Sequence, residues 1–284
     1  MFKNSKKLII LLALVVAAAV AFTGCGQKKE EAPKEEEKAA GLSGSITIAG
    51  STSVQPLSEE LAEAFMSKNS GVTINVQGGG SSAGIKAAKE GAAQIGASSR
   101  ELKSEEKDGI NEYMIALDGI AVVVNSKNEI NELTMEQIQK IFTGEVTNWK
   151  DFGGQDAAIT VVNREAGSGT YGAFEELVIG SDKKYTDKAL TQPSTGAVRT
   201  TVAGDVNAIG YISLGSLNDE VKGIKVDGVE PTVENVKSGA FKISRPFLYL
   251  TKGEPNEVSK AFIDFVMSAE GQNIVKDAHF IPTN

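Results

Sequence analysis

Three times in this chain, a short apolar run is followed by a turn of glycine and hydroxyl residues and then directly by a helical pattern. The turns are Ala49–Pro56 (AGSTSVQP), Gly78–Gly84 (GGGSSAG) and Arg164–Thr170 (REAGSGT). Strands that alternate with helices in this way predict an α/β fold with mostly parallel sheets. Helices in such a sheet begin where the parallel strands end, so we expect the three turns to converge.

The same alternation extends over the rest of the chain from Leu42 onward. The run GIAVVVN (Gly119–Asn125) is almost wholly apolar, which is typical of a strand buried on both faces. Apolar periodicity predicts further strands at 45–49, 72–76, 94–97, 158–162, 209–212 and 245–251, and helices at 57–65, 83–90, 135–142, 171–178 and 258–267. Gly91 is expected to end the second of these helices as a C-cap.

The chemistry of the three turns favours an anion site. Glycine lets backbone amides approach a ligand, and a helix N-terminus offers unpaired N–H donors and a positive dipole end. Arg164 adds a planar fork that suits an oxyanion, and Arg100 either adds a second or forms a surface ion pair. Ordinary helix capping by Ser and Thr is the alternative for each turn taken alone.

Composition excludes several classes of function. Acidic residues outnumber basic ones by 37 to 29, giving a net charge of −8, which argues against nucleic-acid binding. The single Cys (Cys25) and single His (His279) can form neither an internal disulfide nor a Cys/His zinc site. A metal site would have to be built from oxygen ligands. We expect neither a metal nor a cofactor.

Two enzyme motifs overlap in the second turn, and both are weak. Gly80–Gly84 fits G-x-S-x-G, so a secreted serine hydrolase using Ser82 and His279 is one alternative. Gly78, Gly80 and Ala83 fit a dinucleotide fingerprint that has no clear acidic partner downstream. No phosphate-loop motif occurs, and we expect a binding protein rather than an enzyme.

The N-terminus has the pattern of an export signal. Three lysines precede the apolar run Leu8–Phe22, and Cys25 follows a small residue. This resembles a bacterial lipoprotein signal, although Phe22 stands where Leu is usual. The resemblance implies that 1–24 is removed, that Cys25 is lipidated, and that the protein is anchored on the extracytoplasmic face of the cell membrane. The charged segment that follows makes 25–41 a flexible linker.

Eight motifs in order resemble the phosphate-binding protein of phosphate-specific ABC importers. They are Gly50–Pro56, Gly78–Ala87, Ile95–Leu102, Ala116–Asn125, Ile141–Gly154, Asn163–Thr170, Ala208–Leu217 and Ser268–Val275. The resemblance implies a two-lobed, periplasmic-binding-protein-like fold of type II with mixed sheets and a two-strand hinge. Lobe 1 is then 42–120 with 248–284, and lobe 2 is 121–247.

The resemblance also implies the ligand residues and the partners. Inorganic phosphate would bind between the lobes of a monomer, which would deliver it to the permease subunits of the importer. The family's ligand positions map onto Thr52, Ser53, Ser81, Arg164, Ser168, Gly169 and Thr170, and Ser51 and Ser82 adjoin them.

One position departs from the family pattern. Ser99 stands where some members carry an acid that accepts the proton on phosphate. Asp118 is the expected substitute, and an acceptor of this kind would favour phosphate over fully ionised sulfate. An ordinary turn aspartate is the alternative for this residue. For the whole chain, a binder of another oxyanion such as sulfate or molybdate, and a phosphate sensor or adhesin without transport, also stay open.

Overall fold

The computed structural model describes residues 41–180 and 182–283. The predicted signal peptide (1–24) and the lipidation site Cys25 lie outside the described residues, as does the linker except for Gly41. Within the described ranges, no helix combines the length and the apolar character needed to cross a bilayer.

Strands and helices alternate along the chain, as the apolar pattern predicted. The strands are β1 (Ser43–Gly50), β2 (Gly71–Gly78), β3 (Ile95–Ser98), β4 (Ile110–Asn125), β5 (Glu132–Leu133), β6 (Thr160–Arg164), β7 (Leu190–Gln192), β8 (Ala208–Ser213), β9 (Val221–Gly223), β10 (Lys225–Val226) and β11 (Ser244–Lys252). The helices are α1 (Gln55–Lys68), α2 (Ser81–Glu90), α3 (Met135–Thr143), α4 (Gly169–Phe174), α5 (Thr195–Gly204), α6 (Val233–Lys237), α7 (Glu257–Met267) and α8 (Ala269–Asp277).

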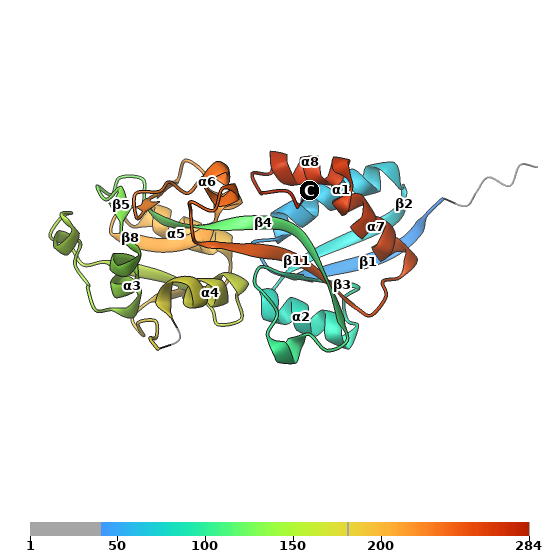
Figure 1. Cartoon of the computed structure of the whole chain (residues 1–284), viewed down its shortest axis with the longest axis horizontal. Helices are drawn as coiled ribbons and strands as arrows, with labels where there is room; N and C mark the ends of the chain where they lie inside the picture. The colour runs from blue at the N-terminus through green and yellow to red at the C-terminus, as the bar shows by residue number, and fades with distance from the viewer. Residues whose placement is uncertain (1–40, 181, 284) are drawn as a thin grey trace, which may run out of the picture. The chain divides into compact units, whose positions relative to one another are not determined.

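One mixed sheet runs through the folded part of the chain, in the order β2-β1-β3-β11-β4-β8-β6-β7 (Figure 1). The pairs towards its two ends, β2-β1-β3 and β8-β6-β7, are parallel. The middle is antiparallel, because β11 pairs antiparallel with both β3 and β4, and β4 with β8. The sheet is mixed as expected, but it is not mostly parallel, because four of its eight strand pairs are antiparallel and the parallel pairs are confined to the two flanks.

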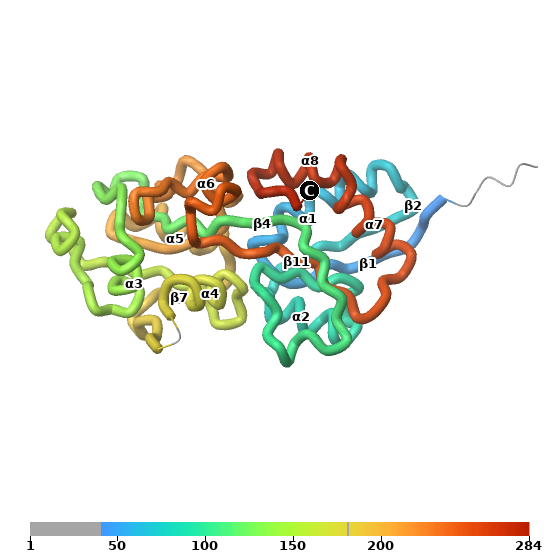
Figure 2. Tube along the Cα trace, in the orientation of Figure 1, coloured from blue at the N-terminus to red at the C-terminus, as the bar shows by residue number. Residues whose placement is uncertain are grey.

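The chain crosses the middle of the molecule on β4 and β11 (Figure 2). The first part of β4, from Ile110 to Gly119, pairs with β11, and the part from Ile120 to Val124 pairs with β8. β4 starts nine residues before the predicted run. Its first residues, INEYM, alternate between apolar and polar, so a pattern of continuous apolar sequence does not include them.

Two large hydrophobic cores lie on either side of this crossing, and a smaller third cluster in the described residues packs α2 and Leu102 against Leu248 and Leu250 of β11. One is built from buried residues between Ile46 and Ala116 and between Phe247 and Phe280. The other is built from residues between Ile120 and Ile243, together with Ile281 from the C-terminal segment. Ile281 reaches the second core because its backbone bonds to Leu117 of β4. The residue boundaries of the two lobes stay a prediction.

Candidate functional site

The first turn brings two buried hydroxyls to the end of β1. The Ser51 hydroxyl accepts a bond from the Ser53 amide (3.2 Å) and donates to Ser99 Oγ (2.8 Å). Gly50 has a φ of 140°, and a Cβ there would overlap the carbonyl oxygen of Ala97. Only glycine therefore lets β1 turn this close to β3.

The second turn places Ser81, at the start of α2, against Ser99, which also accepts the bond from Ser51. Ser81 is completely buried, and its hydroxyl accepts a bond from the Ser99 amide (3.0 Å) and lies 3.4 Å from Ser99 Oγ. The neighbouring Ser82 is only half-buried. Its amide donates to the carbonyl of Gly167 (3.0 Å), which belongs to the third turn.

The third turn closes onto the other two. Ser168 caps α4 by accepting bonds from the Thr170 and Tyr171 amides, and the Thr170 hydroxyl lies 3.0 Å from Ser53 Oγ. A Cβ on Gly169 would overlap Ser81 Oγ and lie 2.5 Å from Ser99 Oγ. The structure thus brings together three turns of which the first and third are more than a hundred residues apart in sequence, as the strand–helix pattern predicted.

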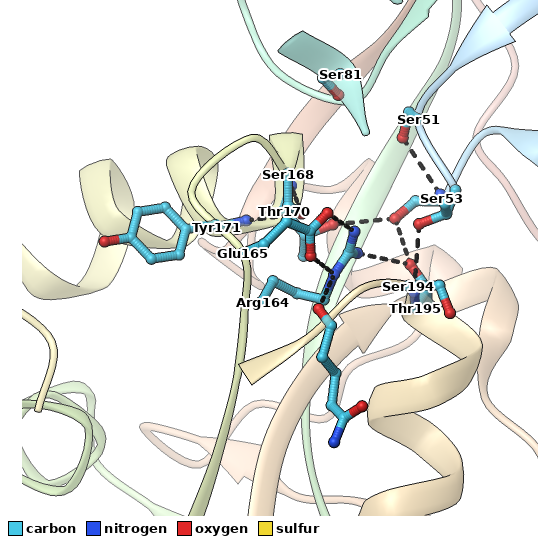
Figure 3. Close-up of polar contacts among 12 residues, drawn as sticks. Ser51, Ser53, Ser81, Arg164, Glu165, Ser168, Thr170, Tyr171, Ser194 and Thr195 are labelled. Carbon is cyan, nitrogen blue, oxygen red and sulfur yellow. Dashed lines mark hydrogen bonds and ion pairs between the residues drawn. The ribbon is translucent and has the colours of Figure 1, made fainter. Parts of the chain in front are cut away.

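Arg164 lies buried beside this cluster (Figure 3). Its Nε and Nη2 donate to the carboxylate of Glu165, and its Nη1 donates to Thr195 Oγ1 (3.2 Å). Because the ion pair with Glu165 fixes the plane of the guanidinium, Arg164 is held in one orientation rather than free to sample rotamers.

An aromatic stack supports the backbone of Arg164. The Arg164 amide donates to Asn163 Oδ1 (2.8 Å), and the same oxygen accepts a short bond from the Tyr211 hydroxyl. The ring of Tyr211 stacks on Phe174 of α4, with centroids 4.0 Å apart. Burial raises the pKa of Tyr211, so the phenol stays a neutral donor at physiological pH.

Thr195 is a contact that sequence reasoning missed. Its hydroxyl lies 2.8 Å from Ser53 Oγ and accepts from Arg164, while its amide donates to Thr52 Oγ1 (3.3 Å). Pro193–Gly196 (PSTG) is a fourth hydroxyl and glycine turn before a helix. It escaped notice because the strand before it, β7, has only three residues and little apolar character.

Two predicted residues lie at the edge of the cluster. The Arg100 guanidinium forms two bonds with the Glu106 carboxylate (2.7 and 2.9 Å), and it also donates to the Glu101 carbonyl (2.8 Å) and, at 3.4 Å, to the Ser82 hydroxyl. The bond from Arg100 lowers the pKa of Glu106. Both Arg100 and Ser82 line a groove of about 1140 Å³ that lies outside the buried hydroxyls. Their role in binding stays a prediction.

Asp118 is completely buried, and its carboxylate is surrounded by donors. Oδ1 accepts from the Ser213 hydroxyl (2.9 Å) and the Leu214 amide (3.2 Å), and Oδ2 accepts two bonds from Arg245 (both 3.1 Å). Burial raises the pKa of Asp118 to about 6, although Arg245 and the other donors oppose the shift. Its predicted role as acceptor of the phosphate proton stays untested by this geometry.

Arg245 is the second residue that the sequence did not identify as part of the site. It lies opposite Asp118 in the register of β11 and β4, and its Nη1 donates to Ser99 Oγ (3.2 Å). In the sequence it is simply the first residue of a strand-like run, RPFLYLT. No local signal indicates that it meets Ser99, which precedes it by 146 residues.

The enzyme alternative finds no support in the described geometry. Among residues 41–180 and 182–283, no hydrogen bond joins Ser82 to His279, and no cluster of three acidic, Cys or His residues could hold a metal. What converges instead is a set of hydroxyls, amides and guanidinium groups, all of which can donate to an oxyanion.

Comparison with known proteins agrees with this chemistry. The family model described as a PBP superfamily domain matches residues 35–270. The phosphate-binding protein PstS of Bacillus subtilis is 37% identical over 292 residues, which cover 99% of this chain and 95% of that protein.

Solved structures agree as well. A putative phosphate ABC transporter substrate-binding protein from Clostridium perfringens, solved with bound phosphate, is 48% identical and has a TM-score of 0.83. The match covers 85% of this chain and all of that one. An ABC-type phosphate transport receptor from Vibrio cholerae is 38% identical, with a TM-score of 0.70 over 83% of this chain and 99% of the other. The chain therefore belongs to the PBP superfamily and, within it, to the family of the phosphate-binding proteins PstS.

Proposed function

We propose that this chain binds inorganic phosphate between its two lobes and delivers it to the permease of an ABC importer. The observation that carries the proposal is the convergence of three hydroxyl-bearing turns, the third of which carries the buried Arg164. The Bacillus subtilis relative, 37% identical and covered to 95%, is named a phosphate-binding protein, and the Clostridium perfringens relative, 48% identical and fully covered, was solved with bound phosphate. The family consists of substrate-binding proteins rather than enzymes.

Short-range hydrogen bonds must supply the affinity, because the chain is net negative and repels anions at long range. A hydrogen bond to a charged group contributes about 1.5–3 kcal/mol, and micromolar binding needs about 8 kcal/mol. Arg164 together with the hydroxyls of Ser53, Ser81 and Thr170 would meet this demand. The proposed ligand set also includes Ser51, Thr52, Ser168 and Gly169.

Binding is coupled to closure in this proposal. Hydrogen bonds between the proposed lobe 1 (42–120 and 248–284) and the proposed lobe 2 (121–247) run along β4 and β11 and around Asp118 and Arg245. Four more join the glycine and hydroxyl turns of the two proposed lobes. They link Ser53 to Thr170, Ser53 to Thr195, Thr52 to Thr195 and Ser82 to Gly167. An oxyanion would take over the hydroxyl donors of these contacts and so hold the lobes together. The closed monomer would then dock on the permease.

The experiment is calorimetry on protein stripped of carried-over phosphate, titrated with phosphate, sulfate and molybdate in turn. We expect one-to-one binding of phosphate. Arg164→Met should weaken it by about 10- to 100-fold, because a charge-assisted bond is lost. Arg199→Met, which removes a partly buried cation of α5 that pairs with Glu220, is the control. Absence of a phosphate response in folded, stripped protein would refute the proposal.

Anchoring belongs to the same proposal. We propose that Cys25 carries the lipid and that residues 25–41 tether the binding domain to the outer face of the cell membrane. Cys25→Ser should release the protein into the soluble fraction while leaving calorimetric phosphate binding unchanged. Mass spectrometry of the wild-type N-terminus would test the modification directly, since an unmodified Cys25 would contradict it.

A further inference from the structure

A buried ion pair lies where the chain crosses between the two cores. Asp118 of β4 and Arg245 of β11 are direct neighbours in the antiparallel register, and both are at most 2% exposed. Asp118 also bonds to Ser213 and Leu214 at the end of β8, whereas Arg245 bonds to Ser99 after β3. The pair therefore links the crossing strands to both sides of the molecule.

The carboxylate of Asp118 has little capacity left for a ligand. A carboxylate accepts about four hydrogen bonds, two on each oxygen. Ser213 and Leu214 use Oδ1, and Arg245 uses Oδ2 twice. This arrangement is that of a residue that holds an arginine in place.

Arg245, by contrast, has donors to spare on the side of the hydroxyl cluster. Its five N–H groups make three bonds to described residues, which leaves one hydrogen on each terminal nitrogen. Nη1 points at Ser99 Oγ, and that oxygen also receives the bond from Ser51 and lies next to Ser81. The ring of Phe247, 5.5 Å from the guanidinium carbon, packs against it.

The charges of the two buried arginines act on each other. Burial lowers the pKa of Arg245, and the positive charge of Arg164 lowers it further. Asp118 pairs with Arg245 and Glu165 pairs with Arg164, so two carboxylates balance the two guanidinium charges.

We propose that Arg245 is a second cationic contact of the bound oxyanion, and that Asp118 is its positioning residue rather than an acceptor for the ligand's proton. This inference rests on the proposed function and deepens it. Because Ser99 is uncharged and takes only one hydrogen of Arg245 Nη1, the second hydrogen of Nη1 can donate to the anion. A site of two guanidinium groups and hydroxyls selects charge and tetrahedral shape, so sulfate should compete with phosphate measurably.

The test is calorimetry of full-chain variants with phosphate and with sulfate. Arg245→Gln should weaken both ligands by roughly 10- to 100-fold, because one charge-assisted contact is removed. Arg245→Lys should recover part of the loss. Asp118→Asn should weaken phosphate and sulfate by the same factor, so their ratio stays within about threefold of wild type. Arg199→Gln is the control for loss of a cation and should bind as wild type does.

A double variant guards against misfolding. Breaking a buried pair leaves an uncompensated charge, whereas replacing both partners with apolar residues is often tolerated. Asp118→Leu with Arg245→Met, checked by circular dichroism and thermal melting, should therefore fold and should show the same weak binding as Arg245→Gln.

Two results would overturn the inference. One is wild-type affinity in either folded Arg245 variant, the Gln substitution or the double variant. The other is a wild-type protein that rejects sulfate and an Asp118→Asn variant that accepts it, since that is the signature of a carboxylate facing the ligand. Failure of the wild type to bind phosphate would refute the proposed function instead, and the Arg245 comparison would then be made with whichever oxyanion binds.

Discussion

Gly169 offers a way to block closure without unfolding the protein. It is the first residue of α4, and an added Cβ would overlap Ser81 Oγ, lie 2.5 Å from Ser99 Oγ and lie 3.0 Å from the Ser99 carbonyl carbon. The two hydroxyls are held by other bonds, and the carbonyl carbon belongs to the backbone. Gly169→Ala therefore has to move α4 away from the first two turns.

The size of the effect follows from these distances. Ordinary contacts of a Cβ begin near 3.4 Å, so α4 must retreat by almost 1 Å. Hydrogen bonds of 2.7–3.2 Å do not survive such a displacement. Loss of two charge-assisted bonds from this side of the site costs about 3–6 kcal/mol, so the Kd for phosphate should rise by roughly 10²- to 10⁴-fold.

The assay is calorimetric titration of stripped Gly169→Ala beside Gly196→Ala. Gly196 occupies the second position of α5, and a Cβ there meets nothing nearer than Ser194 Oγ at 4.0 Å. The control should therefore bind as wild type does. Both variants should still fold, as circular dichroism would show, because alanine suits a helix and the overlap at Gly169 is confined to the contact of α4 with Ser81 and Ser99.

The reasoning is refuted if Gly169→Ala binds phosphate within about threefold of the Gly196→Ala control. Such a result would mean that the third turn does not close against Ser81 and Ser99 around the ligand.

Three further outcomes test other parts of the structure. Thr195→Val removes the hydroxyl shared by Ser53 and Arg164, so calorimetry should show a loss of about 5- to 20-fold in phosphate affinity; unchanged affinity would place Thr195 outside the site. Because burial raises the pKa of Asp118 from 3.8 to about 6, the folded chain binds a proton between these values that the unfolded chain does not. The contribution of Asp118 to the free energy of unfolding should therefore rise by up to about 3 kcal/mol as the pH falls from 7 to 4. Urea denaturation of wild type and Asp118→Asn measures it as the difference between their free energies of unfolding; a fall in this difference on acidification would contradict the raised pKa. Phe174→Ala deletes a fully buried ring that stacks on Tyr211 and should cost about 3–5 kcal/mol in the same assay; a loss below about 1 kcal/mol would mean that the core collapses around the gap.

Local chemistry made much of the site predictable from the sequence. Each of the three turns has its own signature, since glycine, serine and threonine before a helix report backbone conformation and capping within a few residues. Ser168 caps α4, and Gly91 ends α2 in the left-handed conformation with a φ of 73°. The helix expected at Tyr171 instead begins at Gly169 and passes after Phe174 into a π-helical turn, Glu175–Ile179, which the period of its apolar residues did not reveal.

Contacts between distant segments had no such signature. Arg245 meets Asp118 because two antiparallel strands cross in one register, and it meets Ser99 because β11 also pairs with β3. Thr195 reaches Ser53 only because α5 packs beside the third turn. The sequence by itself therefore determined the α/β alternation, the glycine and hydroxyl turns and the family. Tertiary structure alone decided which buried charges face one another, because strand register joins residues far apart in the chain and burial then sets the free energy of their charges.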